Sequence, residues 1–149
     1  MKHRYYIGID PDIDRSGVAV WDSQEKEFYF LNTLDFFPLF HFLYNEFHPI
    51  HQNKCALLRI EAGFLNKSNW HGGAKFSGSA NTEIGRRTGI NHATAMLIEK
   101  MAKDIGIDYE LVKPTKSKVN DANYFKKLTG YTKQTNQEKR DAAMLVYGL

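Results

Sequence analysis

Three short apolar segments at the start of the chain restrict its fold more than any other feature. They cover residues 5–10, 17–22 and 27–33, are rich in Ile, Val, Tyr, Phe and Trp, and are joined by the connectors PDIDRS and SQEK. Ile, Val, Tyr, Phe and Trp favour β-strands, and short polar connectors such as these favour turns. We therefore expect the chain to begin with a meander of three antiparallel strands.

The next two segments predict a helix and then an interior strand. Residues 36–47 carry apolar side chains at helical spacing, and Asp35 is the expected N-cap. Residues 55–62, CALLRIEA, are nearly all apolar up to Glu61, which is typical of a strand covered on both faces. The lone cysteine, Cys55, is expected to be a small buried side chain.

A Gly-rich segment and a long helix are predicted next. Residues 63–80 show no periodicity and are expected to form a long loop. Residues 81–105 predict the longest helix, which ends at Gly106. The apolar side chains expected on its buried face are those of Ile84, Ala93, Met96, Leu97 and Met101.

A fifth strand over residues 108–113 and two short helices complete the chain. The first of these helices is expected to end at Gly130. The expected N-caps are Thr115 or Ser117 for the first helix and Thr135 or Asn136 for the second. The order of elements predicts an α/β fold with a mixed five-stranded sheet, three antiparallel strands and then parallel strands, flanked by helices. We expect a single domain over residues 1–149.

Acidic side chains stand where two of the predicted strands end. Asp10 ends the first strand on the same face as Gly8, which leaves space beside it, and Glu61 ends the fourth strand. Open α/β sheets bind ligands at the carboxyl ends of their strands. In the last helix, Glu138 and Asp141 fall on the stripe that packs against the sheet. We therefore expect these four carboxylates to converge.

Clustered carboxylates need positive charge. Two of them about 4 Å apart repel by roughly 4 kcal/mol at an effective dielectric constant near 20, so the cluster takes up protons or binds a cation. A hard divalent ion such as Mg²⁺ prefers these ligands, and a pair of such ions suits phosphodiester cleavage. The alternative is structural: the acids pair with Lys139 or Arg140 of the same helix, or with Arg59 near Glu61.

Charge and hydropathy narrow the range of partners. Residues 113–133 are rich in lysine and contain the single acid Asp121, although the net charge of the chain is only +3. This stretch suits a phosphate backbone as well as it suits a solvated helix face. No segment approaches the roughly 18 uninterrupted apolar residues of a membrane span, so we expect a cytoplasmic protein without a membrane partner.

Five motifs run in order through nearly the whole chain: YIGIDPDIDRSGVAVWD, LLRIEAGF, EIGRRTGINHATAMLIE, YELVKPTKSKV and NQEKRDAAMLVYGL. This ordered set resembles the RuvC-like Holliday-junction resolvases of the ribonuclease H-like superfamily. Asp12 stands where the family usually has Gly, and we expect both Asp12 and Asp14 to be turn residues. The resemblance implies a ribonuclease H-like nuclease domain.

Carried over position by position, the resemblance also implies roles for individual residues. The implied metal-binding and catalytic acids are Asp10, Glu61, Glu138 and Asp141, which would hold Mg²⁺ or Mn²⁺, with two ions per site. The implied lysines of the site, which contact phosphate or stabilise charge, are Lys113, Lys116 and Lys118. Phe64 is the implied aromatic that stacks on unpaired bases.

The expected function is a metal-dependent endonuclease that cuts branched DNA, such as a four-way junction, in recombination or repair, with a homodimer cutting two strands. Lys67 and Lys75 in the Gly-rich segment are further candidates for DNA contact, and a plain exposed loop is the alternative there. Two other functions stay open. One is a non-catalytic nucleic-acid-binding module of the same fold, and the other is a nuclease acting on RNA or on other branched substrates.

Overall fold

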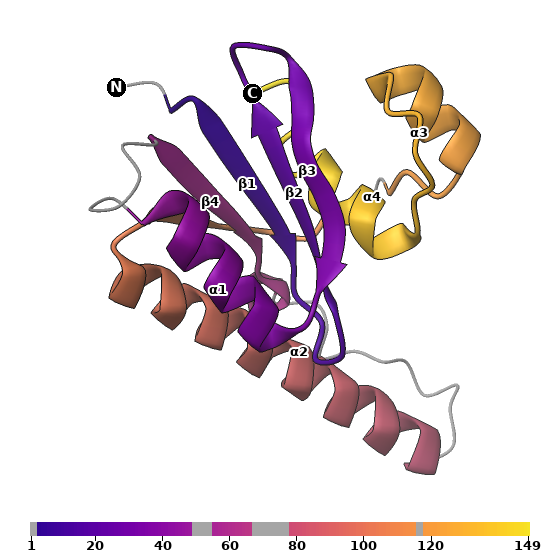
Figure 1. Ribbon diagram of the computed structural model, residues 1–149. Coiled ribbons are helices and arrows are strands. Elements are labelled where there is room, and N and C mark those ends of the chain that lie inside the picture. The colour runs from indigo at the N-terminus through magenta and orange to yellow at the C-terminus, as the bar shows by residue number, and fades with distance from the viewer. Residues whose placement is uncertain (1–2, 49–54, 67–77, 116–117) are drawn as a thin grey trace.

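A mixed five-stranded sheet forms the centre of the computed structural model, which describes residues 3–48, 55–66, 78–115 and 118–149 (Figure 1). From edge to edge the strands are β3 (Glu27–Leu34), β2 (Ser16–Asp22), β1 (Tyr5–Asp10), β4 (Ala56–Glu61) and β5 (Asp108–Val112). β1, β2 and β3 pair antiparallel, whereas β4 pairs parallel with both β1 and β5. The predicted sheet is confirmed.

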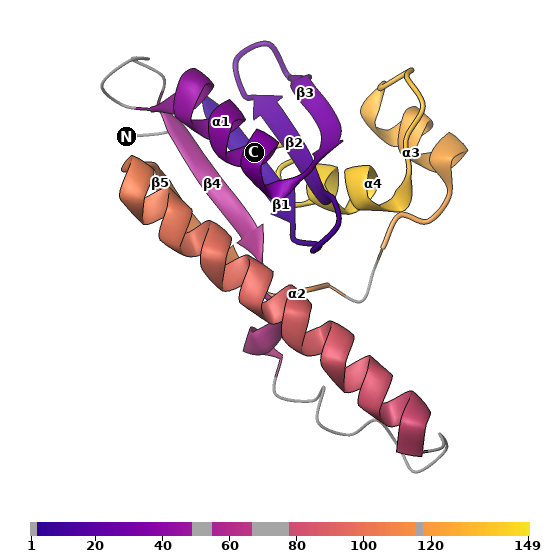
Figure 2. The same cartoon turned by 60° about the horizontal axis from the view of Figure 1, so that its bottom comes forward.

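Helices cover both faces of this sheet. They are α1 (Phe36–Phe47), α2 (Gly78–Ile105), α3 (Ala122–Thr129) and α4 (Gln137–Met144). Figures 1 and 2 show α1 and α2 on one face and α4, with α3 beyond it, on the other. Two apolar clusters fill the two layers: Ile7 and Ile9 of β1 join the first, and Tyr6 of β1 joins the second with Phe125 of α3. β1 therefore lies between two cores.

Two glycines allow α4 to lie very close to the sheet. A Cβ atom on Gly8 would lie 2.2 Å from the carbonyl oxygen of Ala142, and one on Gly17 would lie 2.0 Å from that of Glu138. Neither position has room for a side chain, since real Cβ contacts are essentially never this short. The expected space at Gly8 is therefore not open, because the backbone of α4 fills it.

The buried face of α2 differs from the predicted one. Of the side chains expected there, only Met101 is buried; Ile84, Ala93, Met96 and Leu97 are exposed. The buried positions are Thr94, Ala95, Ile98, Met101, Ala102 and Ile105. Ala95 and Ala102 let the helix approach the sheet closely. The start of α2 extends beyond the sheet (Figure 2), so an apolar residue in that part, such as Ile84, has no core to join.

Several predicted element ends also need correction. α3 begins at Ala122 with Asp121 as its N-cap, and the Asp121 carboxylate accepts hydrogen bonds from the amides of Asn123 and Tyr124. Thr115 is therefore not a cap, and Ser117 lies outside the described residues. The predicted end of α3 is confirmed, because Gly130 has a positive φ of 74°.

The predictions for the other two N-caps agree with the structure, whereas the prediction for Cys55 does not. Asn136 caps α4 by accepting a hydrogen bond from the amide of Lys139. Asp35 is the N-cap residue of α1, although its side chain makes no capping hydrogen bond. Cys55 is exposed rather than buried, and its Sγ atom lies 3.3 Å from Nδ1 of His3, because the strand begins only at Ala56.

The Gly-rich segment is only partly described. Its first residues form a short 3₁₀ turn, η1 (Gly63–Leu65), and residues 67–77 lie outside the described residues. α2 begins at Gly78, three residues before the predicted start at 81. Within the described ranges, no helix combines the length and apolar character that a membrane crossing requires.

Candidate active site

A pocket of about 360 Å³ opens where β1 and β4 end. Its lining includes five acidic side chains, those of Asp10, Asp12, Glu61, Glu138 and Asp141, together with the ammonium group of Lys118. The structure thus brings together all four carboxylates that the sequence predicts to converge. It also adds Asp12, which forms the predicted turn by accepting a hydrogen bond from the amide of Asp14 at 2.8 Å.

Strand register and helix capping place these acids. β1 and β4 run parallel, with Ile9 opposite Ile60, so the following residues, Asp10 and Glu61, leave the sheet at the same edge. α4 contributes the other two acids. Asn136 fixes the start of α4, which puts Glu138 in the first turn and Asp141 about one turn further on.

Asp141 is buried and both of its carboxylate oxygens have partners. Lys118 Nζ donates to Oδ2 at 2.5 Å, and Gln137 Nε2 donates to Oδ1 at 2.7 Å. Burial alone would lower the pKa of Lys118, but the hydrogen bond to Asp141 and the nearby charges of Asp141, Glu61 and Asp10 raise it. Lys118 therefore stays protonated and supplies positive charge to the pocket.

Burial and mutual repulsion make the negative charge in this pocket costly. The pKa of Asp10 is raised to about 7, first by burial and then by the charge of Glu61, with smaller contributions from Asp141 and Glu138. Lys118 opposes this shift. Burial also raises the pKa of Glu61, with Asp141 adding to the effect. Additional positive charge would stabilise the ionised cluster.

The donor set fits a hard divalent cation, since Mg²⁺ and Mn²⁺ are bound by carboxylate oxygens and water. The side chains do not yet form a closed ligand group. Among the described residues, no three acidic, His or Cys side chains are arranged to hold a metal ion. Lys118 occupies one oxygen of Asp141, so a metal ion that bound this oxygen would have to compete with Lys118.

Two of the three expected structural partners of the acids, Arg59 and Arg140, are engaged elsewhere. Arg59 forms an ion pair with Glu110 and donates to the carbonyl oxygen of Leu145 at 2.5 Å. Arg140 is buried and donates to the carbonyl oxygens of Val119, Asn120 and Thr135. Arg140 thereby fixes the segment that follows Lys118, and the ion pair to the acids comes from Lys118 itself.

Two of the remaining candidates, Lys113 and Phe64, are described and are not among the residues that line this pocket. Lys113 is exposed on the segment after β5. Phe64 follows Gly63, which lines the pocket, and packs half-buried against the core with its ring in an edge-to-face contact with His92 at 5.9 Å between centroids. Lys67, Lys75 and Lys116 lie outside the described residues.

Sequence reasoning missed a polar stripe on α2 that faces the acids. Thr88, Asn91 and His92 line the pocket, and Gln137 lines it from α4. The first three follow the i, i+3, i+4 spacing of one helix face, which was the available signal. The apolar residues that predicted the buried face of α2, such as Met96 and Leu97, are exposed and do not indicate this face.

Comparison with solved structures supports the same architecture. The chain is similar to T. thermophilus RuvC, solved in complex with a Holliday junction substrate, with a TM-score of 0.56 and 16% sequence identity. The match covers 96% of this chain and 90% of that one. At this identity the likeness shows the fold alone, which is RuvC-like and ribonuclease H-like. No protein-family model and no curated protein matches the chain.

Proposed function

We propose that this protein is a divalent-metal-dependent endodeoxyribonuclease that cuts branched DNA, as a Holliday-junction resolvase does. One observation carries the proposal: carboxylates from β1, β4 and α4, far apart in the sequence, line one pocket at the carboxyl edge of a RuvC-like sheet. The similar RuvC structure holds a Holliday junction, which supports branched DNA as the substrate class.

The acids of the pocket would hold the metal. Asp10, Glu61, Glu138 and Asp141 are the proposed ligands of Mg²⁺ or Mn²⁺, with two ions per site. When bound, such ions supply an activated water for attack on phosphorus and stabilise the departing oxygen. As a metal ligand, Asp10 would have to be ionised at neutral pH. Burial and its acidic neighbours raise its pKa and so disfavour the ionised form, which a bound cation would stabilise.

The lysines would hold the phosphate. Lys118 is 41% exposed in its side chain and already carries its charge into the pocket, so turning away from Asp141 brings its ammonium group to a phosphate oxygen. Lys113 is exposed and contacts the DNA backbone farther out in this proposal, while Phe64 stacks on an unpaired base. A homodimer would place two such pockets on the two strands that a resolvase cuts.

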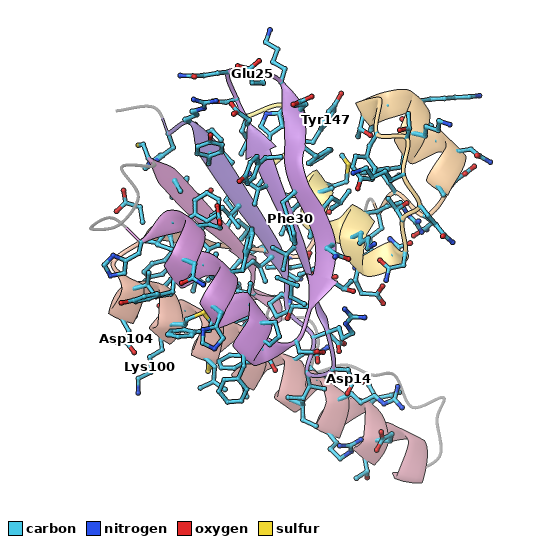
Figure 3. All side chains as sticks on the ribbon, in the orientation of Figure 1. Asp14, Glu25, Phe30, Lys100, Asp104 and Tyr147 are labelled. Carbon is cyan, nitrogen blue, oxygen red and sulfur yellow. The ribbon has the colours of Figure 1, made fainter. Side chains whose placement is uncertain are left out.

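A cleavage assay tests the proposal. A labelled four-way junction should be nicked in Mg²⁺ or Mn²⁺ and left intact in EDTA. Asp10→Asn should lower the rate by more than about a hundredfold, because it removes a ligand charge. Asp104→Asn is the matched control, since Asp104 is exposed on the outer side of α2 (Figure 3). An Asp10→Asn variant that cuts as fast as wild type contradicts the mechanism.

A specific observation favours a second candidate, a non-catalytic nucleic-acid-binding module. Lys118 and Gln137 satisfy both oxygens of Asp141 without a metal ion. Such a module would bind the junction, and no divalent metal would convert binding to cleavage. Parallel assays with duplex DNA, single-stranded DNA and RNA separate a resolvase from a nuclease with another substrate.

A further inference from the structure

A second pocket, of about 350 Å³, lies along the outer edge of β3. We call it the β3 groove. Its lining residues include the aromatic residues Phe28, Tyr29, Phe30 and Tyr131 and the basic residues Lys133 and Lys139. Among the described residues that line it, none is acidic, in contrast to the acid-lined active-site pocket. The β3 groove therefore favours an anionic ligand with flat apolar groups.

The edge strand is irregular beside this groove. Trp21 of β2 pairs with Phe28 and Val20 pairs with Phe30, so Tyr29 is an extra residue that bulges out of the pairing. Tyr29 is 51% exposed, its ring lies 5.8 Å between centroids from that of Tyr5, and its hydroxyl group donates to Glu46 of α1 at 3.3 Å. A bulge interrupts the row of backbone groups to which another strand would pair. This edge is therefore unsuited to adding a peptide strand, and the half-exposed Tyr29 ring lies beside it on the α1 side.

The opposite wall of the groove is anchored at both ends. The Tyr131 ring packs edge-to-face on Phe28, with 6.0 Å between centroids. Arg140 donates to both the carbonyl and hydroxyl oxygens of Thr135 at 3.2 Å, just before the N-cap of α4. The short segment between these anchors carries Lys133, so its position beside β3 is set by the fold.

The β3 groove adjoins the active-site pocket through α4. Glu138 lines the active-site pocket, and the next residue, Lys139, lines the β3 groove. Consecutive residues of a helix point about 100° apart, so the two pockets lie on either side of the first turn of α4. A nucleic-acid strand that leaves one pocket can pass this turn and enter the other.

We propose that the β3 groove binds single-stranded DNA, namely the unpaired part of the substrate strand that continues from the active site. Lys133 and Lys139 hold phosphates on the α4 side of the sheet, and the strand crosses the edge of β3 so that a base stacks on the exposed part of the Tyr29 ring on the α1 side. The proposal rests on the proposed nuclease function only for the identity of that strand.

Paired substitutions at Tyr29 test the stacking. The probe is a fluorescent oligothymidylate of about ten nucleotides, within the usual site size for single strands, measured in EDTA by anisotropy. Tyr29→Leu should weaken binding about tenfold, because it removes the ring. Tyr29→Phe keeps the ring and loses only the hydroxyl bond to Glu46, so it should bind as wild type. Unchanged binding by Tyr29→Leu overturns the stacking, and equal losses in both variants do so as well.

Charge reversals test the phosphate contacts. Lys133→Glu and Lys139→Glu should each weaken oligothymidylate binding and reduce the slope of log affinity against log salt by at least about 0.7. Lys100→Glu, on the outer side of α2 (Figure 3), is the control and should change neither quantity. An equally large effect of Lys100→Glu, or equal losses for the oligothymidylate and a duplex of the same length, overturns the proposal.

Two further readouts separate this inference from the nuclease proposal. Oligothymidylate carrying 5-iodouracil should crosslink to Tyr29 or Tyr131, and crosslinks confined to other residues overturn the groove assignment. If wild type binds through the groove but never cuts junctions in Mg²⁺, the nuclease proposal fails and the groove stands. If wild type cuts junctions and the groove variants bind the oligothymidylate normally, the groove assignment fails alone.

Discussion

Lys118 Nζ lies 2.5 Å from Oδ2 of Asp141, so the acid-lined pocket contains a cation supplied by the chain itself. The two residues are 23 positions apart, and Arg140 fixes the intervening segment by binding the carbonyl oxygens of Val119 and Asn120. In the metal-free protein this contact offsets part of the repulsion among the carboxylates. In the proposed metal site, Lys118 and a divalent cation would compete for the same oxygen.

Removing that lysine should destabilise the metal-free protein. Lys118→Met leaves the buried carboxylate of Asp141 without its ion pair, which should lower the free energy of unfolding by about 1–2 kcal/mol at pH 8, since Lys118 is partly exposed and screened by solvent. Urea denaturation in EDTA measures this change. Lys103→Met removes the ion pair that the exposed Lys103 forms with the half-buried Glu99, a pair within one helix, and should have little effect.

The same variant should bind metal more readily. Because Lys118→Met removes the competitor for Asp141, Mn²⁺ should bind at least as tightly as to wild type while cleavage falls. Titration with Mn²⁺, followed by electron paramagnetic resonance, reports affinity independently of activity. Weaker Mn²⁺ binding by Lys118→Met would show that the lysine supports the metal site instead of competing for it.

Metal binding should raise the thermal stability of wild type. At Mg²⁺ concentrations of about 100 times Kd, linkage predicts a gain of about 2.7 kcal/mol. Asp10→Asn should lose most of this response, and Asp104→Asn, on the outer side of α2, should keep it. A melting temperature that does not change with Mg²⁺ in wild type would favour the non-catalytic module.

The raised pKa of Asp10 predicts a specific pH dependence in EDTA. The pKa of Asp10 is about 7 in the folded chain and 3.8 as the ordinary value, so the folded state holds the extra proton between these values. Stability should therefore fall as the pH rises from about 4 to 7. Asp10→Asn should remove this loss and be more stable than wild type at pH 8 by roughly 2–4 kcal/mol, with the difference vanishing near pH 4. Urea denaturation across this pH range measures the difference in stability between Asp10→Asn and wild type. A difference that is no larger at pH 8 than at pH 4 contradicts the assignment.

The close approach of α4 predicts a large cost for a single methyl group. Gly8→Ala would place Cβ 2.2 Å from the carbonyl oxygen of Ala142, so α4 has to shift, and stability should fall by at least about 1–3 kcal/mol. Gly85→Ala is the matched control. Gly85 lies in α2, and a Cβ atom added there would meet nothing within 4 Å, so the same methyl group should be neutral or stabilising. Chemical denaturation of both variants compares the two sites.

The part of the site that the sequence predicted depends on strand and helix periodicity. Asp10 and Glu61 were predictable because each ends an apolar strand, and alternation along β1 gave the correct face for Gly8. Asp141 was predictable from the helical stripe of α4, although the partner of its carboxylate was not. Lys118 follows β5 in irregular chain, where no periodicity indicates the direction of a side chain.

Other features depend on long-range packing that local patterns do not encode. The buried face of α2 is set by the close approach of Ala95 and Ala102 to the sheet. Large apolar residues predict a different face, which contains Met96 and Leu97. His92 was missed for the same reason, because its access to the acids follows from the rotation of α2 about its axis. The bulge at Tyr29 depends on pairing between β2 and β3, which the sequence of β3 alone does not reveal.

The contacts of Gly8 and Gly17 with α4 have a consequence for how such a chain can vary. Each of the two contacts is between main-chain atoms. The positions of Glu138 and Asp141 therefore depend on the packing of one backbone on another and not on the shapes of neighbouring side chains. Apolar residues elsewhere in the two cores can exchange for others of similar volume while the acids keep their places. Sequences that share little else with this one can hold the same four carboxylates in the same places, provided that they keep glycine at these two positions.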